Sequence, residues 1–558
     1  MLHGLSQAPL VPKLKSNLGI HPCISDHRTF GADHRTFGAE ERYEETMWGT
    51  SFKFLFLFCY QVVLSELIQE GHYIAAVYEH QVILNPNPNA LFNRASALAL
   101  MNRNLDIYEA QVDAAAQQGA QIIVFPEDGI HGFNYTRESI YQFLDFIPPS
   151  LHSLQWNPCL EPDLFNDTDV LQRLSCMARR GRMYVVANLG TKQPCEFSDP
   201  RCPLDGRYQF NTNVVFSSNG TLLARYRKQN LYFEYAFDTP SEVDYVVFDT
   251  PFADKFGVFT CFDILFSEPA VSLIRKFSVK HVVFPAAWIN QLPLLSAIEI
   301  QRGFATGFNI NVLAANIHHT ALSMTGSGIY TPSKSFYYYD MKHEGNKLIV
   351  AQIPVNPSEE SCQKSIVYRN NIQTALFNLP VKDDVCEKEE QRNHSGRSTT
   401  GNQILIPMFY AEMMYDNYTF VPVTEHKGDL QLCAGSLCCY LSYQKVASSS
   451  ELYALGVFNG LHTVHGTYYV QVCALVKCGG LGYDTCGQEV THASNIIDFH
   501  LWGNFSTSYI FPLLLTSNFT LNLPDQWGWE DSYYSMSKNE TSSGLVTAAL
   551  YGRWYEKD

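Results

Sequence analysis

Three side chains that end or follow runs of strand-forming residues could together cleave an amide bond. They are Glu127, which follows the run 121–125, Lys228, which ends the run 221–228, and Cys261, which ends the run 256–261. A carboxylate can take the proton of a thiol, an ammonium can offset developing negative charge, and a sulfur can attack a carbonyl carbon. The set therefore predicts a thiol amidase whose nucleophile is Cys261.

Each of these residues also has an ordinary explanation when it is taken alone. Cys261 fits a core cysteine or half of a disulfide, Glu127 fits a solvated loop acid, and Lys228 fits a surface base at the end of a hairpin. The catalytic interpretation rests on the combination, because loops that follow strand ends open toward solvent while the sheet fixes their backbone.

The runs around these residues predict the elements that hold them. Residues 121–125, apolar after Gln121, predict a buried strand, and residues 212–228 predict a hairpin with its turn at 217–220. Residues 256–261 predict a buried strand that ends at Cys261 itself. The other predicted strands are 73–80, 183–188, 281–284 and 311–316, and the predicted helices are 91–118, 171–181, 269–277 and 294–308. The opening order of strand, helix and strand predicts a sheet covered by helices.

Other residues near predicted strand ends carry weaker signals. Trp288 follows the predicted strand 281–284, so it either lines the substrate pocket or simply packs in the core. His131, His318 and His319 also lie near strand ends, but their spacing does not mark a metal pair. We therefore expect no metal site.

The composition is that of a folded protein without a polyanionic partner. A chain of 558 residues is too long for one ordinary core, so at least two domains are expected. The hydrophobic share of 46% and the aromatic share of 13% are typical of a packed globular protein. A formal charge of -16 and the lack of a basic cluster argue against nucleic acid or an anionic membrane surface as a partner.

The chain divides into parts of different character. We expect a leader and signal region over 1–70, with its apolar core at about 53–65, and a catalytic domain over 71–356. The polar segment 357–405 connects this domain to a disulfide-rich, mainly β domain over 406–558. The apolar core is too short to span a bilayer; a buried core helix is the alternative to a signal peptide.

Glycosylation acceptor patterns agree with secretion. The pattern Asn-X-Ser/Thr occurs at Asn134, Asn166, Asn219, Asn393, Asn417, Asn504, Asn518 and Asn539. The last residues lack the long apolar tail that a GPI anchor requires. We therefore expect a secreted glycoprotein of the extracellular space, without a membrane anchor.

The cysteines allow complete pairing around a free nucleophile. Of 15 cysteines, Cys23 and Cys59 lie in the predicted leader and Cys261 must stay free, which leaves an even number. Cys195 and Cys202 bracket a short loop and form a natural local pair. The cysteines after residue 406 could bind zinc, but secretion favours disulfides there.

Several sequence words resemble the vanin/biotinidase branch of the nitrilase superfamily. They are AAVYEH (75–80), PEDGIHG (126–132), DGRYQ (205–209), RYRK (225–228), TCFDILF (260–266) and MTGSGI (324–329). The resemblance runs from about residue 73 to 558 and weakens at 1–46 and 357–405. The words GLHTVHGTYY (460–469) and TAALYGR (547–553) resemble the biotinidase side of the branch more closely than the vanin side.

This resemblance implies an α/β fold with an αββα four-layer sandwich and a secreted amidase that hydrolyses biocytin to biotin and lysine. By motif, Glu127 is the general base, Lys228 stabilises the oxyanion and Cys261 attacks the carbonyl. Glu234 is a candidate second acid, although Phe233-Glu234-Tyr235 departs from the Gly-Glu form of the vanins. No metal or organic cofactor is needed.

Two alternatives stay open at this point. A vanin-like pantetheinase would share the three catalytic residues and differ in its pocket, and a secreted glycoprotein could bind a vitamin amide without turnover. In either case the partner is a small molecule. Related nitrilases often associate through the helices that flank the sheets, but an added domain could block that surface, so we expect a monomer.

Overall fold

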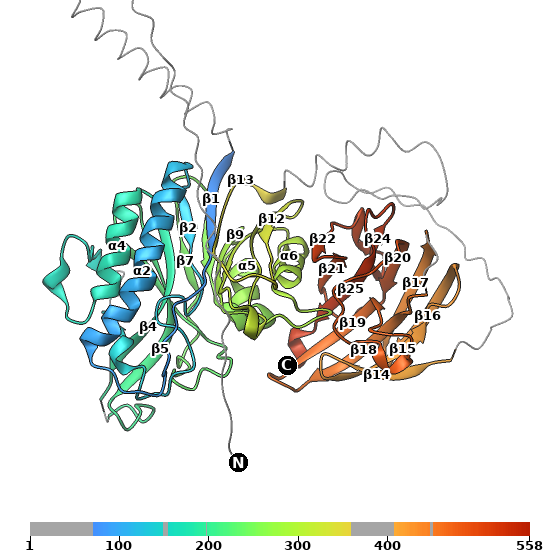
Figure 1. Ribbon diagram of the computed structural model, residues 1–558, viewed down its shortest axis with the longest axis horizontal. Helices are drawn as coiled ribbons and strands as arrows, with labels where there is room; N and C mark the ends of the chain where they lie inside the picture. Colours follow the sequence, from blue (N-terminus) through green and yellow to red (C-terminus); the bar gives the residue numbers. More distant parts are fainter. Residues whose placement is uncertain (1–70, 149–153, 197, 359–406, 447–449) are drawn as a thin grey trace, which may run out of the picture. The chain divides into compact units, whose positions relative to one another are not determined.

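The computed structural model describes residues 71–148, 154–196, 198–358, 407–446 and 450–558 (Figure 1). The predicted signal region and most of the predicted connecting segment lie outside these residues, together with Cys362, Cys386 and Asn393. The described part of the catalytic region contains two sheets, and the described part after residue 406 contains two more.

The first sheet mixes parallel and antiparallel strands. Its order is β13 (Lys347–Pro354), β1 (His72–Glu79), β2 (Ile122–Val124), β4 (Tyr184–Pro194), β5 (Arg207–Phe216) and β6 (Leu222–Arg227), with β3 (Asp145–Phe146) paired to β4. Strands β1, β2 and β4 are parallel, whereas β5 and β6 form the predicted antiparallel hairpin. Glu127 and Lys228 therefore follow β2 and β6 of one sheet.

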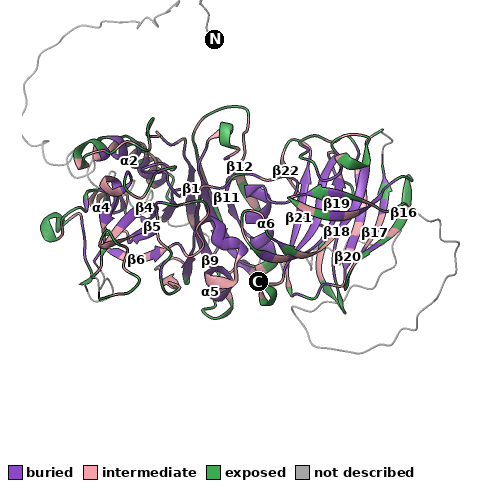
Figure 2. Cartoon of the chain, turned by 90° about the horizontal axis from the view of Figure 1, so that it is seen from below, coloured by how far each residue is buried: buried purple, intermediate pink, exposed green. Residues whose placement is uncertain are grey.

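The second sheet lies against the first. Its order is β12 (Ser335–Tyr338), β11 (Ser327–Tyr330), β10 (Asn311–Asn316), β9 (His281–Ala286), β8 (Phe256–Val258) and β7 (Val246–Phe248). Alternate residues of β1 show the layering: Ala75 and Val77 belong to the core shared with the second sheet, while Ala76 and Tyr78 face the helices. Both β1 and β9 are buried throughout most of their length (Figure 2).

Helices cover the outer faces of both sheets. α2 (Arg94–Gln117) and α4 (Asp169–Gly181) pack on the first sheet, and α5 (Ser272–Arg275) and α6 (Ala297–Phe308) flank the second (Figure 1). α2 begins where Asn93 accepts a hydrogen bond from the Ser96 N–H at 2.9 Å. The layers are thus helix, sheet, sheet and helix, which confirms the predicted αββα sandwich.

The C-terminal part is almost entirely β. One sheet has the order β14 (Phe409–Met413), β15 (Asp416–Pro422), β18 (Tyr453–His462), β19 (Tyr468–Lys477), β25 (Leu545–Arg553), β21 (Tyr509–Thr516) and β22 (Thr520–Leu521). The other has the order β16 (Lys427–Ala434), β17 (Leu437–Lys445), β20 (Ile497–Gly503), β24 (Tyr533–Lys538) and β23 (Gln526–Glu530). Their facing side chains form a separate hydrophobic core, and this sandwich confirms the predicted β-rich region.

Helix α6 is covered by the first of these sheets. A Cβ added at Gly303 would lie 2.6 Å from Leu513 Cδ2, and one at Gly307 would lie 2.8 Å from the Ile510 carbonyl. Strand β21 therefore approaches the helix where the helix has no side chains. The residues of α6 from Ala297 to Thr306 are all buried, so most of the helix face turned away from its own sheet is covered here.

Cysteine pairing follows the prediction where it can be seen. The predicted pair Cys195–Cys202 is confirmed, and the others are Cys159–Cys176, Cys433–Cys438, Cys439–Cys473 and Cys478–Cys486. The C-terminal cysteines are thus joined in disulfides, as we predicted for a secreted protein. Cys261 is the one free cysteine among the described residues.

Two predicted elements were placed wrongly. The strand before the nucleophile ends at Val258 instead of Cys261, because the chain leaves the sheet and enters the 3-10 helix η3 (Cys261–Leu265). The predicted helix 269–277 is a π turn, η4 (Ser267–Val271), followed by the single turn of α5. Glu268, directly before Pro269, has an extended backbone (φ -109°, ψ 126°), which residues before a proline favour, so no continuous α-helix forms here.

Candidate active site

Cys261 opens a short helix whose start is fixed by hydrogen bonds. The Thr260 and Asp263 side chains form a capping box around it, in which the Thr260 N–H donates to Asp263 Oδ2 at 3.0 Å. The same carboxylate oxygen accepts the Tyr226 hydroxyl at 2.6 Å. Cys261 itself has φ 46°, a left-handed conformation that costs free energy and is typical of functional sites.

Lys228, Glu127 and Glu234 form a buried cluster beside this turn. Lys228 Nζ donates to Glu127 Oε1 at 2.7 Å and also to Glu234 Oε2. Lys228 is 2% exposed and Glu127 is 1% exposed. Glu234 reaches the cluster because its loop after β6 turns back, with Phe233 at φ 55°. The structure thus brings together the three predicted catalytic residues and the candidate second acid.

Glu127 has its oxygens oriented by three donors. Oε1 accepts from Lys228 and from Asn211 Nδ2 at 2.8 Å, and Oε2 accepts from the Ala287 N–H at 2.9 Å. These bonds occupy both lone pairs of Oε1 but only one of Oε2, so Oε2 can accept one further proton donor.

The thiol of Cys261 is protonated at rest. Burial raises its pKa well above the ordinary value, and the negative charge of Glu127 raises it further. Lys228 and the Ala287 N–H act in the opposite direction without reversing the shift. A buried thiol of this kind needs a base to become a nucleophile, and Glu127 is the base at hand.

Lys228 stays charged although it is buried. Burial alone would lower its pKa, but Glu127 and Glu234 outweigh burial and hold the pKa well above its ordinary value. The pKa of Glu234 is raised, first by burial and then by repulsion from Glu127, with Lys228 opposing both. The cluster therefore presents a cation that stays charged, next to Glu127 and to a second carboxylate, Glu234, that is easier to protonate than an ordinary glutamate.

Trp288 lies next to this cluster but makes its own bonds elsewhere. Its backbone N–H donates to Asn316 Oδ1 at 2.7 Å, and its indole N–H donates to the Leu295 carbonyl at 2.9 Å. The side chain is buried. Its indole donor is therefore used inside the protein, and only the ring is left to contact a ligand.

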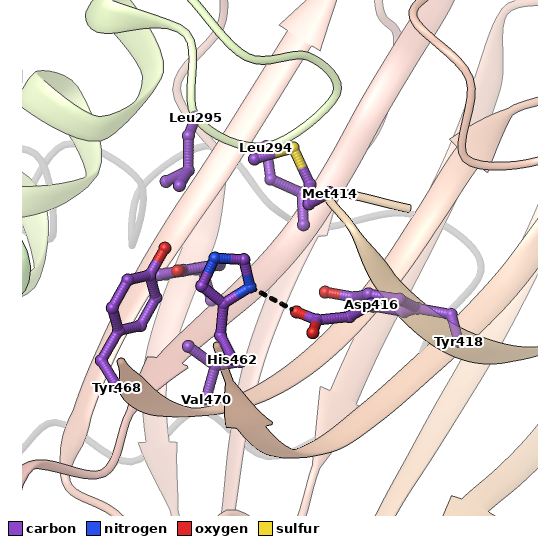
Figure 3. Close-up of a pocket in the computed structure, with 9 residues that line it drawn as sticks. Leu294, Leu295, Met414, Asp416, Tyr418, His462, Tyr468 and Val470 are labelled. Carbon is purple, nitrogen blue, oxygen red and sulfur yellow. Dashed lines mark hydrogen bonds and ion pairs between the residues drawn. The ribbon is translucent and has the colours of Figure 1, made fainter. Parts of the chain in front are cut away.

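A separate cavity of about 10 Å³ lies between the loop before α6 and the C-terminal sheet (Figure 3). Leu294, Leu295 and Met414 line it above a His462–Asp416 pair joined at 2.8 Å. None of the cluster residues lines it. This cavity holds about one water and is not the active site.

The remaining candidate histidines do not form a metal site. His131 is buried and neutral because burial lowers its pKa to about 4. His318 Nδ1 bonds the buried Glu79 carboxylate at 2.7 Å, whereas His319 lies apart on the next turn. Within the described ranges no group of three or more His, Cys, Asp or Glu side chains could hold a metal ion.

Sequence reasoning missed several residues that build the site. Asn188, Asn211 and Asn213 lie buried between the catalytic carboxylates and Thr260. The one available signal was the spacing of Asn211 and Asn213, which places two amides on the same face of a buried strand. Arg553, from the last strand of the chain, also reaches the nucleophile turn, where its Nε donates to the Leu265 carbonyl at 2.7 Å.

Most glycosylation acceptors are on the surface. Those with exposed side chains are Asn134, Asn166, Asn219, Asn417, Asn518 and Asn539. Asn504 is half-buried and accepts a hydrogen bond from the Cys438 N–H at 2.6 Å. In the part of the chain that the structure describes, no helix combines the length and apolarity needed to cross a membrane.

Family models match both parts of the chain. The carbon-nitrogen hydrolase model matches residues 88–289, and the vanin C-terminal domain model matches residues 408–558. Among solved structures, an amidase from Nesterenkonia sp. is 19% identical and covers 55% of this chain and 98% of its own, with a TM-score of 0.37. That score is too low to support a comparison of the two folds.

Sequence relatives cover nearly all of the chain. Human biotinidase is 61% identical over 90% of this chain and 94% of its own length, and mouse biotinidase is 64% identical over 87% and 94%. A bovine pantetheinase is 46% identical over 87% of this chain and 90% of its own. The chain belongs to the biotinidase family, in the vanin branch of the carbon-nitrogen hydrolases.

Proposed function

We propose that this protein is an amidohydrolase that cleaves biocytin and other biotinyl amides to biotin and lysine or another amine. The observation that carries the reaction type is the one free thiol of the described residues, buried beside a lysine and an oriented carboxylate. The choice of substrate rests on the biotinidase relatives, which are 61% and 64% identical, against 46% for the pantetheinase.

In the acylation step, Glu127 takes the proton of Cys261 as the sulfur attacks the amide carbonyl carbon. The carbonyl electron pair moves to oxygen, and the Lys228 ammonium stabilises the resulting oxyanion. When the tetrahedral species collapses, the C–N bond breaks and the amine leaves with the proton from Glu127. A thioester on Cys261 remains.

In the deacylation step, water replaces the amine. Glu127, again ionised, takes a proton from water, and the hydroxide adds to the thioester carbonyl with the oxyanion once more beside Lys228. Collapse breaks the C–S bond, the acid is released, and the proton returns to the sulfur. The same base and cation thus serve both half-reactions.

Glu234 and Trp288 have supporting roles in this proposal. Glu234 accepts a hydrogen bond from Lys228 and one from Asn211, so it aims the ammonium without needing to exchange a proton with substrate. Trp288 contributes its ring to the wall that contacts the acyl group, since its indole N–H is already bonded to Leu295.

We also infer that the protein is a secreted, glycosylated monomer. Disulfides in both parts and exposed acceptor asparagines support export. The burial of the outer face of α6 under β21 supports the monomer, since that helix is then closed to a second copy. A catalytic domain over 71–356, a connection over 357–405 and a β domain over 406–558 remain the division that we propose.

The test is hydrolysis of biocytin and of pantetheine, side by side, by the secreted protein and by Cys261→Ala. We expect cleavage of biocytin with a much higher kcat/KM than that of pantetheine, and loss of both in the variant. A preference for pantetheine would reassign the substrate. Binding of biocytin without turnover of either amide would make the protein a vitamin-binding glycoprotein and overturn the catalytic proposal.

A further inference from the structure

Three buried asparagines connect the catalytic carboxylates to the turn that carries the nucleophile. Asn211 Nδ2 donates to Glu127 Oε1 at 2.8 Å and also to Glu234 Oε1. Asn188 Nδ2 donates to Asn211 Oδ1 at 2.6 Å and to Asn213 Oδ1 at 2.9 Å. All three asparagines are at most 1% exposed.

The far end of this chain of amides reaches the residue before Cys261. Asn213 Nδ2 donates to Thr260 Oγ1 at 2.8 Å, and Thr260 caps the helix that begins at Cys261. The near end also holds the residue after the base, because Asn188 Oδ1 accepts the Asp128 N–H at 3.0 Å. These hydrogen bonds therefore connect four segments: the loop after β2, strands β4 and β5, and the turn after β8.

The hydrogen bonds determine the orientation of the three asparagine side-chain amides. Carboxylates only accept, so Asn211 must turn its NH₂ toward Glu127 and Glu234 and its oxygen toward Asn188. Asn188 must then present its NH₂ to Asn211 and Asn213, which leaves its oxygen for the Asp128 N–H. Asn213 in turn presents its NH₂ to Thr260. One orientation satisfies all the groups: reversing Asn188 or Asn211 sets oxygen against oxygen, and reversing Asn213 sets its NH₂ against that of Asn188.

We propose that Asn188, Asn211 and Asn213 act as positioning residues, which hold both catalytic carboxylates in their accepting orientation and in fixed register with the nucleophile turn. The proposal deepens the thiol-amidase function and rests on it. Asn188 is its decisive member, because it contacts neither the carboxylates nor the turn directly and acts through the two other amides and the backbone of Asp128.

A substitution at Asn188 should change the hydrogen bonds of the Glu127 carboxylate. In Asn188→Asp the NH₂ becomes an oxygen, so Asn211 must reverse its amide to donate to it and thereby turns its own oxygen toward Glu127 and Glu234. Both carboxylates then lose a hydrogen-bond donor and face an amide oxygen in its place. The groups facing Glu127 are the cation Lys228, the acids Glu234 and Asp128, and the neutral Cys261 and His131.

The experiment measures two pH profiles of the secreted protein, that of kcat/KM for biocytin and that of the alkylation rate of Cys261 by iodoacetamide. For Asn188→Asp we expect kcat to fall about 10- to 100-fold with little change in KM, and the acidic limb to move up by about one pH unit. Asn311→Asp is the matched control. Asn311, the first residue of β10, is as buried as Asn188, and its side chain donates to the Pro354 carbonyl.

The outcomes separate this inference from the proposed function. If Asn188→Asp is not secreted, Asn188→Ser, which shortens the side chain without adding charge, is measured in its place. A folded Asn188 variant with unchanged profiles, or an Asn311→Asp control that shifts them equally, would overturn the positioning role. If the unaltered protein does not cleave biocytin, the proposed function fails, while the alkylation profile still decides the role of the asparagines.

Discussion

Lys228 Nζ lies 2.7 Å from Glu127 Oε1, and the same ammonium also bonds Glu234. One buried cation is therefore shared by two carboxylates, which differ in their other partners. Glu127 accepts from Asn211 and from the Ala287 N–H, whereas Glu234 accepts from Asn211 and the Tyr232 N–H in a flexed loop. Only Glu127 accepts a hydrogen bond from the Ala287 N–H, which also reaches the Cys261 thiol. We therefore expect the two carboxylates to have different tasks.

The two carboxylates should respond differently to neutralisation. We predict that Glu127→Gln lowers kcat for biocytin by about 10³-fold, because the thiol then lacks its base. Glu234→Gln should lower kcat by only about 10-fold, because it disturbs the aim of Lys228 and leaves the base in place. The measurement is steady-state kinetics together with the rate at which iodoacetamide alkylates Cys261.

The alkylation rate provides the control for this comparison. It should fall strongly in Glu127→Gln and little in Glu234→Gln, since the buried thiol must pass its proton to Glu127 as it attacks iodoacetamide, whereas no oxyanion forms in this reaction. Equal losses in the two variants, or a larger loss in Glu234→Gln, would mean that the base has been assigned to the wrong carboxylate.

The last strand of the chain should support the nucleophile turn through one arginine. Arg553 is fully buried, its Nε donates to the Leu265 carbonyl at 2.7 Å, and its guanidinium lies 4.8 Å from the Tyr468 ring centre. We predict that Arg553→Lys lowers the thermal midpoint and also lowers kcat about 10-fold, because an ammonium cannot supply the same fork of donors. Thermal unfolding and kcat are measured on the same preparation.

A second buried arginine is the control for this effect. Arg302 in α6 donates to the Thr331 carbonyl at 2.5 Å and to the Pro332 carbonyl at 3.2 Å, without touching the nucleophile turn. Arg302→Lys should lower the thermal midpoint comparably and leave kcat of the folded fraction unchanged. Similar kcat losses in both variants would show that Arg553 matters for stability alone.

Local sequence signals predicted the elements of the site because each signal lies within one strand and its turn. The apolar run before Glu127 and the hairpin before Lys228 give β2, β5 and β6, and the polar loops that follow them come from the same few residues. The same periodicity predicted a sheet covered by helices, whereas the four-layer αββα sandwich was implied by the family resemblance. The roles of Glu127, Lys228 and Cys261 remain predictions that the kinetics above test.

Contacts that depend on register and on distant segments could not be predicted in this way. The bond between Asn188 and Asn213 exists because β4 and β5 pair with these two residues opposite each other, and nothing in either strand alone fixes that register. Arg553 meets Leu265 across most of the chain. The end of the strand before Cys261 was also missed, since the capping box at Thr260 competes with strand pairing over only a few residues.

The close approach of β21 to α6 should be sensitive to one glycine. A Cβ at Gly307 would lie 2.8 Å from the Ile510 carbonyl and 2.8 Å from Phe511 Cδ1, so a side chain there must push strand and helix apart. We predict that Gly307→Val lowers the thermal midpoint by several degrees. Gly345→Ala, where an added Cβ meets nothing within 4 Å, is the control. Unchanged stability of Gly307→Val would contradict this packing.

Light scattering of the same variants tests the monomer. The unaltered protein should have the mass of one glycosylated chain, because β21 occupies the helix face that a second copy would need. In Gly307→Val the loosened face should favour self-association at high concentration. A stable dimer of the unaltered protein would show that another surface mediates assembly, and the monomer proposal would then be wrong.

The buried acid of α6 should make stability depend on pH. Glu299 is 1% exposed, its Oε2 accepts the Ser296 hydroxyl at 2.5 Å, and burial raises its pKa from 4.5 to about 8. Between these values the folded protein keeps a proton that the unfolded chain has lost, so the free energy of unfolding falls as pH rises from about 5 to about 8. The contribution is at most about 5 kcal/mol.

Glu299→Gln should remove this part of the dependence. The amide cannot ionise, so the decline in thermal midpoint between pH 5 and pH 8 should become shallower than in the unaltered protein, and the variant should be the more stable of the two at pH 8. The control is Glu344→Gln, an exposed acid whose pKa is lowered despite slight burial, since it bonds Thr320. If Glu299→Gln leaves the slope unchanged, Glu299 is ionised in the fold and pairs with a group other than Ser296.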